Sequence, residues 1–240
     1  LIEMKKISAF SLIALTGLMI IQFSCSKNIE GRTDNLPALS PANIDLEAGK
    51  WKLVTLSRPD SFAVAAPAAI TLPGYIGELN EVKGLQFNMT AAQKDKIKYW
   101  SAGAVLRWNE IIRELVAKHN LPPYQNEDGT YPIPSSANPF NYPQFPFSNP
   151  PFAARAYAYI SAAQYDALVA CWYYKKLYNR AAPYKVDSTI NANATMIAKT
   201  DLPSYPSEQA VLAGVTAELM KAFFPTEIAF INQKKQKFHK

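Results

Sequence analysis

The chain has 240 residues, and 49% of them are hydrophobic, which is enough for one sizeable core or two small ones. The formal net charge is +6, but part of that charge lies at the two ends, where Lys5 and Lys6 precede an apolar run and several lysines crowd residues 234–240. A protein that binds nucleic acid should carry its basic residues as a stripe on the fold, so the charge distribution disfavours nucleic acid as a partner.

The N-terminus, "MKKISAFSLIALTGLMIIQFSCSKN", has the layout of a secretory signal, with an apolar stretch from Ile7 to Phe23 and then Ser-Cys. A small residue before a cysteine is typical of a bacterial lipoprotein signal, in which Cys25 becomes the lipidated first residue. Gln22 and Phe23 fit that motif poorly, so ordinary cleavage stays an alternative. A membrane-spanning anchor is another, because the run is just long enough to span. We therefore expect an exported protein in the bacterial periplasm or at the outer-membrane surface, lipid-anchored at Cys25.

Residues 26–47 are polar and are predicted to form a flexible tether, followed by a helical domain over residues 48–240. Cys171, in "ALVACWYY", is the one cysteine beyond the signal. It lies on an apolar run, so we expect it to be inert core, with no partner for an intrachain disulfide.

Two helices are expected before a proline-rich segment. Pro73-Gly74 predicts a turn, and "YIGELNEVKGL" after it predicts a short helix. Thr90 and Gln93 form a capping box that opens one long amphipathic helix reaching about residue 120. Its apolar positions recur at helical spacing; they are Ile97, Trp100, Ala104, Trp108, Ile111, Ile112 and Leu115.

Residues 121–151 hold nine of the 18 prolines together with repeated Phe and Tyr, so they cannot form a regular helix. A domain linker is one interpretation, but linkers rarely carry so many aromatic residues. The composition favours a long ordered loop packed over a helical body, near a functional site.

The stretch after this loop, "FAARAYAYISAAQYDALVACWYYKKLYN", is apolar nearly all round, which predicts a central, buried helix. Two more helices are expected, from Glu208 to about Phe224 and from Glu227 toward the C-terminus. No alternating strand pattern of useful length is found. The predicted fold class is mainly α, a helical bundle with a long Pro- and aromatic-rich loop.

Ser207 occupies the N-cap position of the helix in "LPSYPSEQAVLAGV". A serine hydroxyl and the unpaired backbone N–H groups of a first helical turn form a site for an anion. The alternative is that Ser207 merely caps the helix, with Glu208 placed favourably against the helix dipole. Spacing alone favours the capping role.

The stretch "PSYPSEQAVLAGVTAELMKAFFP" resembles the second motif of the superfamily that joins type 2 phosphatidic acid phosphatases, bacterial acid phosphatases and vanadium-dependent haloperoxidases. In that family, Pro-Ser-Gly-His precedes a helix of small residues. "YWSAGAVLRWNEI", "AARAYAYISAAQYDALVACWYYKKLYN" and the proline-rich loop between them are similar to its secreted haloperoxidase-like branch. The resemblance covers Trp51 to Pro225 and implies a helical bundle that binds a phosphate or vanadate oxyanion.

The family's first motif has a Lys and, nearly two helical turns later, an Arg followed by Pro. Lys175 fits the Lys and Pro183 fits the Pro, but the position of the Arg is taken by Ala182. Arg180 lies two residues early and points about 140° away from Lys175 on an ideal helix. It can serve as an oxyanion ligand only if the helix ends before it.

In the second motif, Ser207 fits the serine that hydrogen-bonds the oxyanion, and Glu208 replaces the glycine, so that only its backbone N–H matches the family. Gln209 replaces the acid–base histidine and cannot shuttle a proton at neutral pH. The third motif, with its Arg and its nucleophilic or vanadate-binding His, would lie downstream. His239 lacks the Ser-Arg that should precede it, and His119 is expected to be an exposed residue at a helix end.

The resemblance therefore implies a C-terminally truncated fragment of a secreted haloperoxidase-like or acid-phosphatase-like protein, with no catalytic group intact and no turnover as given. Lys175, Arg180, Ser207 and the backbone of Glu208 would bind the oxyanion, with Lys175 close to Ser207 and Arg180 at the rim of the pocket. Vanadate is the cofactor expected of the complete parent, with no cofactor and no metal expected for this chain. The alternative is a non-catalytic surface lipoprotein that uses the helical fold as a binding or structural module.

Overall fold

The computed structural model describes residues 36–39, 44–119, 127–130, 150–190 and 202–239. The chain divides into two compact units, Leu1–Asn35 and Leu36–Lys240, and every described residue belongs to the second unit. The predicted signal with Cys25 and most of the proline-rich segment lie outside the described residues, so both stay predictions. None of the helices in the described ranges combines the length and the hydrophobicity that a membrane span requires.

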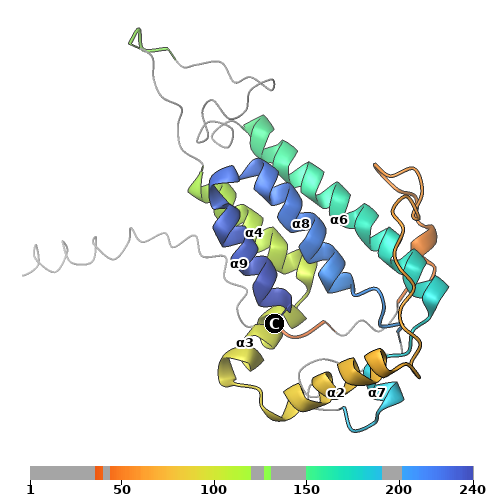
Figure 1. Ribbon diagram of the computed structural model, residues 1–240. Coiled ribbons are helices and arrows are strands. Elements are labelled where there is room, and N and C mark those ends of the chain that lie inside the picture. The colour runs from red at the N-terminus through yellow and green to blue at the C-terminus, as the bar shows by residue number, and fades with distance from the viewer. Residues whose placement is uncertain (1–35, 40–43, 120–126, 131–149, 191–201, 240) are drawn as a thin grey trace, which may run out of the picture. The chain divides into compact units, whose positions relative to one another are not determined.

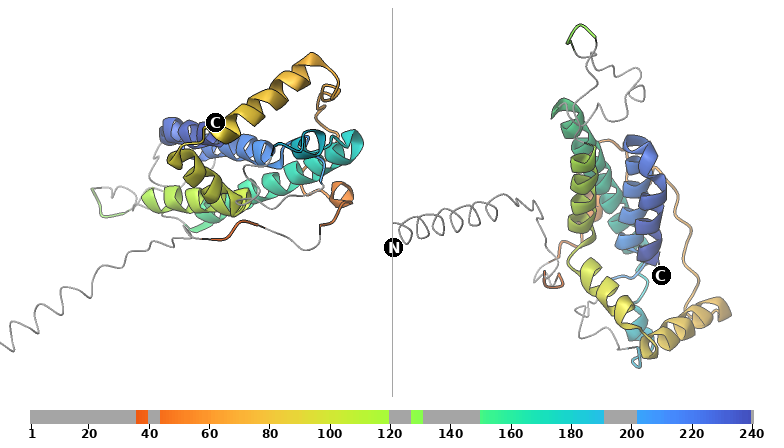
Figure 2. Two further views of the ribbon diagram at one scale, coloured as in Figure 1. Left: turned by 90° about the horizontal axis from the view of Figure 1, so that it is seen from below. Right: turned by 90° about the vertical axis from the view of Figure 1, so that its left-hand side faces the viewer.

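The described residues form helices joined by irregular segments and include no strand, which confirms the mainly α class. The helices, in chain order, are η1 (Ala48–Lys50), α2 (Pro73–Phe87), α3 (Ala91–Ser101), α4 (Ala104–Lys118), α6 (Pro150–Tyr178), α7 (Pro183–Val186), α8 (Glu208–Phe223), η2 (Pro225–Glu227) and α9 (Ile228–His239). α4, α6, α8 and α9 run alongside one another, and α6 makes its most extensive contact with α8 (Figure 1). α2 lies across the end at which α6 ends and α8 begins (Figure 2).

Two of the predicted helices have different bounds in the structure. The single helix expected from Thr90 to about residue 120 is wrong, because Gly103 has a φ of +115° and separates α3 from α4. Residues other than glycine rarely adopt that backbone conformation, and a Cβ at Gly103 would also lie 2.8 Å from the Leu39 side chain. Pro73 does not form a turn but occupies the first turn of α2, where its missing N–H costs nothing. The capping box of Thr90 and Gln93 is confirmed.

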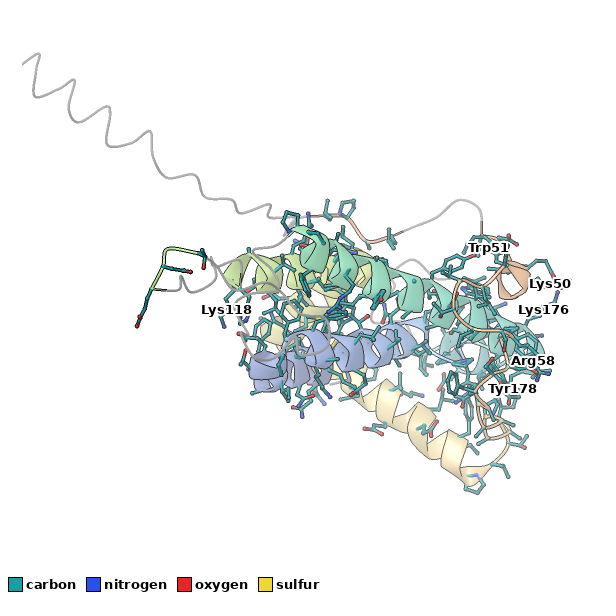
Figure 3. The ribbon with its side chains drawn as sticks, turned by 90° about the horizontal axis from the view of Figure 1, so that it is seen from above. Lys50, Trp51, Arg58, Lys118, Lys176 and Tyr178 are labelled. Carbon is teal, nitrogen blue, oxygen red and sulfur yellow. The ribbon has the colours of Figure 1, made fainter. Side chains whose placement is uncertain are left out.

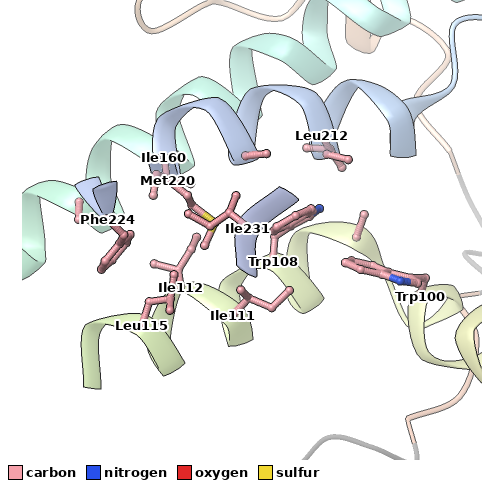
Figure 4. Packing of buried hydrophobic residues seen from close by; sticks show 14 residues of the cluster. Trp100, Trp108, Ile111, Ile112, Leu115, Ile160, Leu212, Met220, Phe224 and Ile231 are labelled. Atoms are coloured by element: carbon pink, nitrogen blue, oxygen red, sulfur yellow. The ribbon is translucent and has the colours of Figure 1, made fainter. Parts of the chain in front are cut away.

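An apolar cluster fills the space between α4, α8, α9 and the N-terminal half of α6 (Figure 4). Its largest members are Trp100, Trp108, Ile111, Ile112, Leu115, Ile160, Leu212, Met220, Phe224 and Ile231. Small residues at the contact of α6 and α8, with Ala156 and Ala213 fully buried, allow the two helices to approach closely. The same contact contains one polar pair, in which the amide of Gln164 donates to the hydroxyl of Thr216 at 2.8 Å.

Residues 45–65, called the N-terminal wrap here, lie along the C-terminal half of α6. η1 packs on α6 so closely that a Cβ at Gly49 would lie 2.5 Å from the backbone nitrogen of Tyr173. Glu47, in the predicted tether, pairs with Lys176 and Lys50, and hydrogen bonds from these two lysines lower the pKa of Glu47 to about 2. Figure 3 shows Lys50 and Lys176 grouped at this end of α6. The last residues of the predicted tether therefore contact the helical body.

Asp166 fixes the middle of the wrap to α6. Its carboxylate is 1% exposed and accepts hydrogen bonds from the backbone N–H groups of Val54, Thr55 and Leu56 at 2.6–2.9 Å, and from the Thr55 hydroxyl at 2.6 Å. Burial by itself would raise the pKa of Asp166, but the hydrogen bonds from Thr55 and the three N–H groups outweigh it and lower that pKa to about 2.

Three tyrosine hydroxyls bind the C-terminal end of the wrap, where the backbone is neither helix nor strand. Each hydroxyl donates to a backbone carbonyl: Tyr174 to Phe62 at 2.8 Å, Tyr178 to Val64 at 2.5 Å and Tyr205 to Ala65 at 2.9 Å. The wrap thus satisfies part of its backbone with side chains more than 100 residues away in the sequence.

Candidate functional site

Lys175, on the last turn of α6, lies at the start of α8. Its side chain is nearly buried, and its ammonium donates to the Pro203 carbonyl at 2.5 Å. The same Nζ lies 3.7 Å from Oε1 of Glu208, the first residue of α8, and 5.7 Å from the ring of Trp172. A buried charge needs such partners. The structure therefore places Lys175 close to the helix start at Ser207, as the sequence led us to expect.

Ser207 is the N-cap of α8, and its Oγ accepts a hydrogen bond from the Ala210 N–H at 3.3 Å. The capping role is thus confirmed. It uses an acceptor lone pair of the hydroxyl and leaves the O–H hydrogen able to donate to an anion. Gln209 is exposed on the first turn of α8, where it offers an amide but no group that titrates near neutral pH.

Arg180 could serve as an oxyanion ligand only if the helix ended before it. The structure meets this condition, because α6 ends at Tyr178 and Asn179 turns the chain with a φ of +43°. The guanidinium carbon lies 4.6 Å above the ring of Tyr75 and 5.8 Å from the ring of Tyr205. Its NH2 group approaches Glu78 of α2 at 3.4 Å. Arg180 is thus directed toward α2, while Lys175 is directed toward the start of α8.

The backbone between residues 203 and 207 connects the two cations. The carbonyl of Pro203 accepts from Lys175, and the next N–H, of Ser204, donates to the Arg180 carbonyl at 2.9 Å. The Ser204 hydroxyl also donates to the Ala181 carbonyl at 3.0 Å. Lys175 and Arg180 are therefore held by consecutive residues of one segment, although their charged groups face different neighbours.

Cys171 lies one helical turn before Lys175 and is buried and outside any disulfide, as expected of an inert core thiol. Its Sγ donates to the Pro206 carbonyl at 3.6 Å. Burial raises the pKa of the Cys171 thiol to about 12, with only partial opposition from the nearby charge of Lys175. The thiol stays protonated at neutral pH and is a poor nucleophile there.

His119 is not the exposed residue that we expected. It ends α4, but its side chain is only 15% exposed, and Nε2 lies 2.9 Å from Oε1 of Glu227. Hydrogen bonds from Lys118 and then from His119 lower the pKa of Glu227. This group ties the end of α4 to η2, so the burial of His119 has a structural cause.

Three residues around the site were not predicted from the sequence. Tyr75 and Tyr205 flank the Arg180 guanidinium, and Asp166 positions the wrap along α6. Tyr205 lies inside the "PSYPS" motif, so the sequence could have indicated it as a residue of the site. Nothing in the pattern around Tyr75 distinguishes it from other apolar helix positions. Within the described chain, no three His, Cys, Asp or Glu side chains are grouped so that they could hold a metal ion.

Comparisons of the chain with family models, with curated proteins and with solved structures gave no match.

Proposed function

We propose that this chain is part of an exported protein similar to bacterial acid phosphatases and vanadium haloperoxidases, and that Lys175 and the start of α8 bind a phosphate or vanadate oxyanion. One observation carries the proposal: a nearly buried ammonium lies beside the first turn of a helix, with its Nζ 3.7 Å from Glu208 Oε1. The backbone N–H groups of that turn and the helix dipole favour a negative charge at the same place.

In this chain, the site is expected to bind the oxyanion without catalysing a reaction. The acid–base position holds Gln209, the matched arginine position holds Ala182, and no nucleophile is assigned. General acid–base help is worth roughly 10²–10⁴ in rate, and covalent phosphoryl transfer also needs a nucleophile. Vanadate would be the cofactor of a complete parent protein, bound at the same cation and helix start.

Glu208 weakens binding in this proposal. Its carboxylate lies where an oxyanion would approach Lys175, so an incoming anion has to displace it. Two like charges at about 4 Å repel by roughly 4 kcal/mol near a protein surface, and rotation of Glu208 into solvent relieves most of that repulsion. We therefore expect Glu208→Gln to bind phosphate about tenfold more tightly, since the Lys175 charge is then unopposed.

The binding test uses equilibrium dialysis of inorganic phosphate, and ⁵¹V NMR for orthovanadate, with the full 240-residue chain. Lys175→Met should weaken binding by roughly ten- to a hundredfold, the value of a hydrogen bond to a charged group. Lys176→Met is the matched control, because Lys176 is the next residue but is exposed and pairs with Glu47. Equal weakening in the two variants would reduce the effect to general surface charge and contradict the site.

The activity test measures p-nitrophenyl phosphate hydrolysis and vanadate-dependent bromination. We expect neither above the buffer blank. Turnover that disappears in Ser207→Ala would show that Gln209 and Arg180 do more than the motif comparison allows, and the proposal of a silent site would be wrong.

One observation favours the alternative, a non-catalytic surface lipoprotein. Lys175 already has a carbonyl and a carboxylate as partners, as a structural lysine would. Under this alternative, Lys175→Met unfolds more easily while the wild-type chain binds neither anion.

The lipid anchor is tested separately with a palmitate analogue, which should label the wild type and Cys171→Ala but not Cys25→Ala.

A further inference from the structure

Tyr75 carries a buried hydroxyl that no described residue satisfies. Its side chain is 2% exposed, and its hydroxyl oxygen has no hydrogen-bond partner in the described part of the chain. A buried hydroxyl without a partner is unfavourable in free energy, so such a group calls for a physical reason. Tyr75 is also the one residue of α2 that is fully buried, although several apolar residues of that helix are exposed.

The neighbour of Tyr75 is the guanidinium of Arg180, whose carbon lies 4.6 Å above the tyrosine ring. A guanidinium has five N–H donors, and among the described residues the side chain of Arg180 makes one hydrogen bond, a long one of 3.4 Å to Glu78. The groups left over at this position are therefore an O–H and guanidinium N–H donors. A ligand that satisfies them has to supply acceptors, and an oxyanion supplies several on one small group.

The position of this pair relative to Lys175 is fixed by the backbone. Arg180 receives the N–H of Ser204 on its carbonyl, and Lys175 donates to the carbonyl of the preceding Pro203. The ring of Tyr205, two residues before the N-cap of α8, closes the other side of the guanidinium at 5.8 Å. The Tyr75–Arg180 pair thus borders the same segment that leads into the start of α8.

We infer that the Tyr75 hydroxyl is a further ligand of the oxyanion, which it binds together with Arg180 at the α2 side of the site; this inference rests on the function proposed above. Tyr75 is held there independently of its hydroxyl, because α2 is attached through Lys83 to Asp187 at 3.2 Å and through Gln86 to the Thr189 carbonyl at 3.0 Å. The hydroxyl therefore contributes to binding and not to the attachment of the helix.

The test compares Tyr75→Phe with Tyr165→Phe in the full 240-residue chain, using equilibrium dialysis of inorganic phosphate and thermal unfolding in phosphate-free buffer. Both variants lose one tyrosine hydroxyl, but the Tyr165 hydroxyl already has a partner, because it donates to the Lys52 carbonyl of the wrap at 2.9 Å. Tyr75→Phe should bind phosphate roughly tenfold more weakly and unfold at the same or a higher temperature. Tyr165→Phe should keep its phosphate affinity and unfold at a lower temperature.

Three results would overturn the inference. Equal phosphate affinity of wild type and Tyr75→Phe would remove Tyr75 from the site while leaving the proposed function intact. Failure of the wild type itself to bind phosphate would end the proposed function and this inference with it. Loss of the folded far-UV circular dichroism signal in Tyr75→Phe would show that the hydroxyl supports the fold, contrary to its lack of a partner in the described residues.

Discussion

The N-terminal half of α6 packs in the apolar cluster of α4, α8 and α9, whereas its C-terminal half is held by the N-terminal wrap through side-chain hydrogen bonds. In the cluster, Ile160 and Ala156 are fully buried against other apolar side chains. At the other end of α6, the side chains of Asp166, Tyr174 and Tyr178 each bind backbone groups of the wrap, within residues 54–64. One helix is thus stabilised by non-directional burial at one end and by directional contacts at the other.

The two kinds of contact contribute differently: apolar burial mainly stabilises the fold, whereas hydrogen bonds mainly fix the positions of the residues that they join. Burial of a large apolar side chain contributes about 1.5–3 kcal/mol and tolerates exchange for a residue of similar volume. A hydrogen bond contributes about 1 kcal/mol net but fixes the place of both partners. Lys175 and Arg180 belong to the hydrogen-bonded end, so the candidate site is held by contacts of small individual energy and strict geometry.

The largest effect should come from truncation in the apolar cluster. Trp108 is fully buried, and Trp108→Ala should lower the free energy of unfolding by about 4 kcal/mol, because it removes a tryptophan side chain from the cluster and leaves a cavity. Trp51→Ala is the control in the wrap. Trp51 is 49% exposed and donates to Asp45, so its loss should cost only about 1 kcal/mol. Urea unfolding followed by circular dichroism measures both values.

If Trp51→Ala is as destabilising as Trp108→Ala, the division of α6 into two kinds of contact is wrong. The wrap would then be part of the core, and its hydrogen bonds would be a by-product of apolar burial.

The next effect comes from Asp166 of α6, which accepts four hydrogen bonds from the wrap. Asp166→Asn keeps the size of the side chain but turns one acceptor oxygen into an NH2 group that faces backbone donors. We expect a loss of about 3 kcal/mol, because buried N–H groups are left without acceptors. Thr55→Val removes only the hydroxyl contact and should cost about 1 kcal/mol. A smaller loss for Asp166→Asn than for Thr55→Val would contradict the assigned role.

Acid should weaken the wrap before it affects the cluster. The pKa of Asp166 is about 2 in the folded chain, below its ordinary value, so the folded state releases its proton more readily than the unfolded state does. This stabilisation is complete above about pH 4 and is lost as the pH falls toward 2, and it amounts to about 2 kcal/mol. The stability gap between wild type and Asp166→Asn should therefore narrow over that range. If the difference in the free energy of unfolding between the two proteins stays constant from pH 5 to pH 2, the protonation of Asp166 is not linked to stability.

Sequence patterns predicted the cluster better than the wrap, and the reason is physical. Helical periodicity records which face of a helix is apolar, so α6, α8 and α9 were anticipated close to their observed bounds. The break at Gly103 was missed because the apolar period continues on both sides of it. The wrap leaves no period at all, since its partners are single polar side chains far away in the sequence, such as Asp166 for Thr55.

The candidate site was predictable in part for the same reason. Lys175 and Ser207 lie at helix ends, where cap residues and charge changes are visible in the sequence. The placement of Arg180 against Tyr75 depends on where α2 docks, and that docking rests on the isolated contacts of Lys83 and Gln86. No local sequence pattern indicates such contacts. The sequence therefore predicted only that the helix had to end before Arg180 if Arg180 was to bind the oxyanion.

The smallest effect is expected from a single α6 hydroxyl that binds the wrap, that of Tyr174. Its removal tests most directly whether the wrap positions residues more than it stabilises the fold. Tyr174→Phe removes the hydrogen bond to the Phe62 carbonyl but keeps the ring, which stacks on Tyr178 with 5.7 Å between centroids. Stability should fall by about 1 kcal/mol in urea unfolding. Because the Tyr174 hydroxyl binds the Phe62 carbonyl, its loss should also loosen the wrap and make the amide hydrogens of residues 54–56, which are bonded to Asp166, exchange faster, while exchange within α4 stays unchanged. Hydrogen exchange that rises equally in α4 and in the wrap would mean that the two ends of α6 unfold as one unit.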